Sequence, residues 1–146
     1  MRYLSALLLV TACGISLQLA HAAGPTPQHS AECVAALQVE AEAMADQYRG
    51  GHTEVEAELV RQVQQGFAFI GTAYLQGVRD TEADRLLKAA EAAQKEIPAA
   101  ELSARQVACR KEGARLLEKA NAIERALVMK AAQRRVDRLK HPRATG

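Results

Sequence analysis

Cysteine and histidine are the residue types in this 146-residue chain whose spacing could bind a metal or carry redox chemistry. Cys33 and Cys109 stand far apart, and neither belongs to a C-x-x-C or a C-x-x-C-H motif. No histidine is expected beside them, because His29, His52 and His141 fall in segments that we predict to be loops or chain ends. The spacing therefore predicts no metal site and no cofactor.

Motifs of the common enzyme classes are also missing from the sequence. It contains no H-E-x-x-H, no G-x-S-x-G, no glycine-rich phosphate loop and no EF-hand pattern. Beyond residue 22 the serines are Ser30 and Ser103, and both suit helix N-caps, Ser103 in an S-x-x-Q box with Gln106. We therefore expect a protein that is not an enzyme.

The first 22 residues have the pattern of a secretory signal peptide. Arg2 provides a positive charge, residues 3–19 form an apolar run, and residues 20–22 end the segment with the small-x-small sequence A-H-A. Cleavage there predicts a periplasmic or secreted protein. Two alternatives are an uncleaved membrane anchor and a lipoprotein acylated at Cys13, where residues 10–13 read VTAC.

Export would leave Cys33 and Cys109 as an even pair of cysteines in an oxidising compartment. Such a pair favours a disulfide. The alternative is two unreactive buried thiols.

Alanine, leucine, glutamate, glutamine and arginine dominate the chain, and aromatic residues are 3% of it. This composition favours helices over strands and predicts an all-α fold. After a flexible segment at 23–29, apolar residues recur every three or four positions in four helices, at about 30–49, 53–78, 80–97 and 99–140, before a tail at 141–146. Ser30 is the expected N-cap of the first helix, and Thr53 with Glu56 forms an expected capping box for the second.

Short predicted turns favour an antiparallel, up-down four-helix bundle. In an antiparallel pair of helices, two residues lie level with each other when their residue numbers add to a constant, which the connecting turn sets. Applied from turn to turn, this rule places Cys33 level with residue 69 of the second predicted helix and finally with residue 108 of the fourth. Cys33 and Cys109 should therefore meet. The same register leaves residues 119–140 without a partner, so the last helix should extend about 30 Å beyond the others at 1.5 Å per residue.

Charge is divided along the chain. Residues 31–100 carry 6 Lys and Arg against 12 Asp and Glu, whereas residues 101–143 carry 12 against 5. A basic amphipathic helix suits an envelope protein, an anionic membrane surface or a second copy of the chain, and a merely solvated helix end is the alternative. Nucleic acid is not expected, because aromatic residues that could stack on bases are missing from this helix. The candidate binding residues are Arg125, Lys130, Arg134, Arg135, Arg138 and Lys140.

Glycines at positions 66, 71 and 77 interrupt the second predicted helix, where each should cost about 1 kcal/mol relative to alanine. Either a neighbouring helix approaches closely there, or the helix is kinked around a ligand slot. The second possibility makes Phe67, Phe69, Ile70 and Tyr74 candidates for an apolar client surface and predicts, as an alternative function, a periplasmic chaperone or carrier of small hydrophobic ligands. Residues 102–106, LSARQ, are similar to one copy of the LTxxQ motif of the periplasmic stress chaperones, which have two copies.

Overall fold

A computed structural model describes residues 24–142, and every regular element among them is helical. The all-α class predicted from composition is confirmed. The predicted signal peptide and Cys13 lie outside the described residues. The elements are α1 (Pro27–Arg49), a short 3-10 helix η1 (Thr53–Val55), α2 (Glu56–Leu75), α3 (Asp80–Gln94), α4 (Ala99–Lys119) and α5 (Ala122–Lys140).

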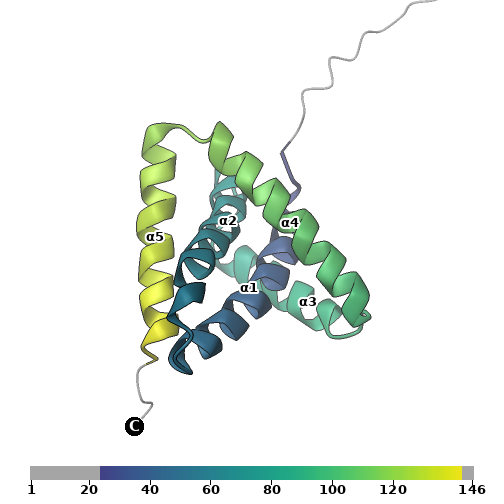
Figure 1. Ribbon diagram of the computed structural model, residues 1–146. Helices are drawn as coiled ribbons and strands as arrows, with labels where there is room; N and C mark the ends of the chain where they lie inside the picture. Colours follow the sequence, from purple (N-terminus) through teal and green to yellow (C-terminus); the bar gives the residue numbers. More distant parts are fainter. Residues whose placement is uncertain (1–23, 143–146) are drawn as a thin grey trace, which may run out of the picture.

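Helix α1 is the centre of the fold and packs on each of the other four α-helices. Helices α4 and α5 form the two arms of an inverted V that meets at the top of Figure 1, with α1 and α2 behind and between the arms. Helix α3 packs mainly on α1 and has few contacts with α2 and α4. The helices therefore do not form the predicted ring in which each helix packs on the next.

The last predicted helix, 99–140, is two helices in the structure. α4 ends at Lys119, and α5 begins at Ala122 and runs back along α1 and α2 instead of projecting beyond them. Asn121 caps α5 in a reciprocal capping box with Glu124, which satisfies two backbone N–H groups at the break. Residues 119–140 thus find their partner within the chain.

Helix α1 begins earlier than predicted. Thr26 is its N-cap, with a side chain that accepts a hydrogen bond from the backbone N–H of His29, and Pro27 occupies its first turn. Ser30 is therefore not the cap but a buried residue one turn into the helix. Because α1 begins at Pro27, residues 27–29 of the predicted flexible segment 23–29 are helical.

The predicted boundaries of the second and third helices are also too wide. Thr53 and Glu56 do not form the expected box, because Thr53 starts η1 and α2 begins at Glu56 without a side-chain cap. Gly77 adopts φ +94° after the end of α2, a conformation that suits glycine. α3 stops at Gln94, short of the predicted residue 97.

The close approach expected at the glycines of α2 is found elsewhere. A Cβ atom added to Gly66 or Gly71 would meet nothing within 4 Å. A Cβ atom at Gly113 in α4 would lie 2.8 Å from the Cβ atom and 2.9 Å from the backbone oxygen of Gln65 in α2. Only glycine therefore allows α4 to approach α2 this closely.

Two small cores lie along the axis of α1. One, here called the lower core, joins α1, α2 and α5 and contains Ala41, Ala45, Leu59, Val63, Ala132 and Val136. The other, here called the upper core, joins α1, α2 and α4 and contains Cys33, Leu37, Phe69 and Cys109. Burial of Ala132 and Val136, one helical turn apart, holds α5 against the α1–α2 pair.

Three glutamines connect the surrounding helices to the backbone of α1. Gln62 of α2, Gln94 of α3 and Gln106 of α4 donate hydrogen bonds to the successive carbonyl groups of Leu37, Ala35 and Ala36 at 3.1, 3.3 and 3.2 Å. Cores made largely of alanine have few large side chains that could interlock. Side-chain hydrogen bonds of this kind therefore fix the rotation of each surrounding helix and its register along α1.

Candidate functional site

The structure contains the predicted disulfide between Cys33 of α1 and Cys109 of α4, with Cα atoms 5.3 Å apart. Both cysteines are buried, and Leu37 and Phe69 pack around them. The bridge closes a loop across 76 positions. It therefore joins the first and fourth helices through the upper core.

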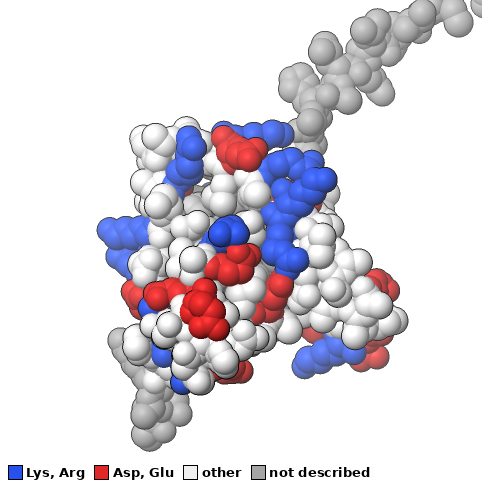
Figure 2. All heavy atoms as spheres, in the orientation of Figure 1, with Lys and Arg blue, Asp and Glu red and all other residues white. Residues whose placement is uncertain are grey.

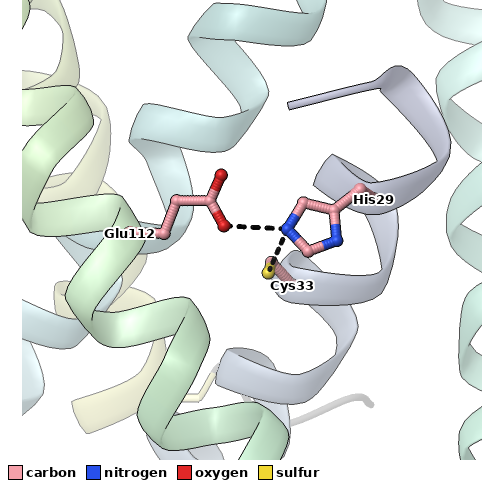
Figure 3. Close-up of side chains that lie close together, drawn as sticks. All are labelled: His29, Cys33 and Glu112. Carbon is pink, nitrogen blue, oxygen red and sulfur yellow. Dashed lines mark hydrogen bonds and ion pairs between the residues drawn. The ribbon is translucent and has the colours of Figure 1, made fainter. Parts of the chain in front are cut away.

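A histidine and a carboxylate lie beside this bridge, as Figure 3 shows. Nε2 of His29 lies 2.8 Å from a carboxylate oxygen of Glu112 and 3.7 Å from Sγ of Cys33. The ring of His29 also meets the ring of Phe69 edge-on, with centroids 6.3 Å apart. The His29 and Glu112 side chains remain 46% and 33% exposed, so the cluster opens to solvent on one side.

This cluster was not predicted from the sequence, because His29 was expected to lie in a loop before the first helix. Once Thr26 is recognised as the N-cap, His29 and Cys33 have the i, i+4 spacing of one helix face. Thr26 followed by Pro27 is the sequence signal that could have revealed the earlier helix start. The expectation that no histidine lies near the cysteines is therefore wrong.

Two of the six candidate basic residues take part in the packing of α5. Lys140 forms an ion pair with Glu56, and its Nζ atom lies 4.6 Å from the centre of the Tyr48 ring. The hydrogen bond to Glu56 raises the pKa of Lys140, and the hydrogen bond to Tyr48 adds to this, although burial of the ammonium group acts in the opposite direction. Arg135 pairs with Glu42 of α1 at 3.6 Å.

The other four residues are exposed and form no ion pair with any described residue: Arg125, Lys130, Arg134 and Arg138. Lys130, Arg134 and Arg138, here called the basic stripe, follow at intervals of four residues and share one helix face. Two exposed apolar residues, Ile123 and Leu127, continue the same face toward the start of α5. This face of α5 is therefore apolar at one end and basic at the other.

The apolar end of that face belongs to a larger patch at the corner where α4 turns into α5. The members of this corner patch, with their exposed fractions, are Tyr74 (59%), Leu75 (71%), Ile123 (74%) and Leu127 (64%). Tyr74, Leu75 and Leu127 line one groove of about 360 Å³ between α2, α4 and α5, with Lys119 at its edge. In Figure 2, uncharged atoms lie at the upper left over the start of α5, and basic and acidic side chains flank them near the α4–α5 turn, with further Lys and Arg along α4.

Three of the four residues predicted to form an apolar client surface line one groove: Phe69, Ile70 and Tyr74. Phe69 is at the same time fully buried, and it packs against the disulfide. Phe67 is half-buried against the lower core. Ile70 is 45% exposed, and Tyr74 lies under the guanidinium group of Arg79, 4.0 Å from its ring centre.

The groove that Phe69, Ile70 and Tyr74 line lies between α2 and α3, with α1 as its floor. Its volume is about 200 Å³. Val34, Val78 and Leu87 give it an apolar lining. Ser30 also lines it, and its buried hydroxyl has no hydrogen-bond partner in the described chain.

Comparison with protein-family models, curated proteins and solved structures gives no match to this chain. None of the helices in residues 24–142 is both long enough and apolar enough to cross a membrane.

Proposed function

We propose that this chain is an exported, non-enzymatic helical protein that binds anionic membrane surfaces through the corner between α4 and α5. One observation carries the proposal: the corner patch of Tyr74, Leu75, Ile123 and Leu127 continues into the basic stripe on a single face of α5. An exposed apolar patch next to cationic side chains suits the interface between acyl chains and anionic headgroups. The disulfide supports export, because such bonds persist in oxidising compartments.

The spacing along α5 fits the depth of a membrane interface. An interfacial helix buries its apolar side chains about 5–10 Å into the boundary between headgroups and acyl chains. Lys130 is seven residues beyond Ile123, which is about 10 Å along a helix. If the corner enters the membrane first, Lys130 reaches the level of the phosphates, and Arg134 and Arg138 remain above it in the negative surface potential.

Cosedimentation with vesicles tests this proposal. The protein should bind vesicles that contain phosphatidylglycerol, bind pure phosphatidylcholine vesicles much more weakly, and lose binding as salt screens the surface potential. Reversing the basic stripe, with Lys130→Glu, Arg134→Glu and Arg138→Glu, should weaken binding by at least about 100-fold, since each cation near such a surface contributes about 1 kcal/mol.

A matched control is available on α3. Arg85 and Lys88 are exposed and lie on a helix at the opposite corner of the molecule from the α4–α5 turn (Figure 1). Their reversal to Glu should leave most of the binding intact. Equal losses in the two variants would show that net charge alone attracts the protein to the vesicle, which contradicts the assignment of the corner.

The groove between α2 and α3 favours a second candidate, a carrier of a small apolar ligand. A cavity of roughly 150 Å³ admits benzene, so the 200 Å³ groove has room for a small ring or a short alkyl chain. The unpaired hydroxyl of Ser30 would orient one polar group of such a ligand. Uptake of a small hydrophobic dye that Val34→Trp blocks would support a carrier, whereas no uptake by the native protein would exclude it.

A further inference from the structure

Two short helical motifs face each other across the upper core. His29 and Cys33 are four residues apart on α1, and Cys109 and Glu112 are three residues apart on α4. Residues at either spacing share a helix face. The bridge between the two cysteines brings both faces together. One imidazole, one sulfur and one carboxylate, from His29, Cys33 and Glu112, lie within 4.8 Å of one another, and the second sulfur, from Cys109, is bonded to the first.

These are the donor types that zinc prefers, and the distance between the His29 and Cys33 donor atoms is close to that in a tetrahedral site. Ligands at Zn–S of about 2.3 Å and Zn–N of about 2.1 Å lie about 3.6 Å apart at the tetrahedral angle. The Sγ of Cys33 is 3.7 Å from Nε2 of His29. The His29–Glu112 contact of 2.8 Å would have to open by roughly half an ångström to admit the ion.

In the oxidised protein the two sulfur atoms are bonded to each other and are poor ligands. We propose that the dithiol form of the protein binds one zinc-like divalent cation through His29, Cys33, Cys109 and Glu112. A dithiol reductant supplies two electrons and two protons, breaks the Sγ–Sγ bond and leaves as its own disulfide. Metal binding then releases the two cysteine protons to solvent, because thiolates are the ligands.

The surroundings of the cluster suit such a site. The cysteines are buried, which protects the thiolates, whereas His29 and Glu112 are partly exposed and give the ion a route from solvent. Four protein ligands would form a closed, structural site without an open position for catalysis. The ion would then join α1 to α4 in place of the disulfide before oxidation or after reduction.

Titration with Co²⁺ as a spectroscopic substitute for zinc tests the proposal. The full chain is reduced with a phosphine, freed of the phosphine without oxygen, and titrated beside the oxidised protein. The reduced protein should bind one Co²⁺ per chain and show thiolate-to-cobalt charge-transfer bands and tetrahedral visible bands, and the oxidised protein should show neither. Absence of these bands from the reduced protein overturns the proposal, whether that protein is folded or unfolded by circular dichroism.

Variants of His29 and Glu112 distinguish the four-residue site from a site in which the two cysteines alone bind the metal. His29→Ala and Glu112→Gln should each weaken Co²⁺ binding by at least about tenfold, the loss typical of disturbing a metal site. His52 and Glu54 form another exposed histidine–carboxylate pair, at 3.2 Å, with no cysteine beside it, so His52→Ala is the matched control and should have no effect. Unchanged affinity in both His29→Ala and Glu112→Gln would contradict the four-residue site.

Discussion

The side chain of Asn121 accepts a hydrogen bond from the backbone N–H of Glu124, and the carboxylate of Glu124 accepts one from the backbone N–H of Asn121, both at 2.9 Å. α4 ends at Lys119, just before this pair, and α5 begins at Ala122 in a new direction. This change of direction places Ile123 and Leu127 at an exposed corner and returns Val136 to the core. The position of the proposed membrane-binding face depends on it.

Removing this cap should destabilise the protein. Asn121→Ala should lower the free energy of unfolding by about 1 kcal/mol, the usual effect of losing an N-cap side chain. Ser103 opens one of the two boxes that the sequence predicts, but it lies inside α4 and is exposed, so Ser103→Ala should change stability little. Urea denaturation of the two variants checks this, and equal losses would contradict the observed helix boundaries.

A pair of glycine substitutions should act in opposite directions. Gly113→Ala puts a methyl group against the backbone of Gln65 and should cost about 1–3 kcal/mol, the usual effect of overpacking. Gly66→Ala adds a methyl group in open space within α2 and should stabilise by roughly 0.5–1 kcal/mol. Thermal denaturation followed by circular dichroism measures both. A stable Gly113→Ala protein would show that α4 does not approach α2 as described.

The disulfide should contribute strongly to stability. On the chain-entropy relation, a bridge between residues 76 apart stabilises by about 4 kcal/mol. Replacing both Cys33 and Cys109 with Ala should therefore remove a large part of the unfolding free energy of so small a protein. Urea denaturation of this variant and of the oxidised parent measures the difference, and a loss below about 1 kcal/mol would contradict the prediction.

Lys140 should stabilise the fold in a pH-dependent way. Its pKa is raised above its usual value of 10.5 in the folded protein, mainly by its hydrogen bond to Glu56. The stabilisation is therefore complete below pH 10.5 and is lost as the pH rises through the folded pKa. Because Glu56 is 42% exposed, solvent screens the pair, and Lys140→Met should cost only about 1 kcal/mol near neutral pH.

The matched control for this prediction is Lys130→Met, since Lys130 is exposed and forms no ion pair with a described residue. It should leave the unfolding free energy nearly unchanged. The difference in stability between the parent and Lys140→Met should shrink above pH 10.5. A difference that stays constant through that range would contradict the role of the Lys140 ammonium group.

Composition was sufficient to predict the helical class, and the predicted helices and turns were sufficient to predict the contact between Cys33 and Cys109. In the predicted register Cys33 lies level with residue 69 and then with residue 108, and Cys33, Phe69 and Cys109 do share one core. That register assumed a ring of helices, which the structure lacks because α2 packs directly on α4. The chain runs out along α3 and back along α4, so these two helices together add little net displacement. The predicted register therefore still brings the two cysteines to the same level.

The return of α5 was missed because its apolar pattern continues almost unbroken from α4. The sequence does contain the signal, an N-x-x-E box at Asn121 and Glu124 without a glycine or proline to mark it. The location of the corner patch could not be predicted for the same reason. Without the turn, Ile123 and Leu127 would lie on the part of the last helix that projects beyond the others, so only the tertiary packing of α5 places Leu127 beside Tyr74 and Leu75.

Vesicle binding by a variant of the corner patch tests the central proposal most directly. Ile123→Ser and Leu127→Ser together remove the apolar end of the α5 face, whereas Val39→Ser with Val107→Ser removes two exposed apolar side chains of α1 and α4 as a control. The corner variant should lose at least about tenfold in affinity for anionic vesicles, since full burial of each such side chain is worth about 1.5–3 kcal/mol, and the control should bind like the parent. A corner variant that remains folded and binds these vesicles as tightly as the parent would contradict the account.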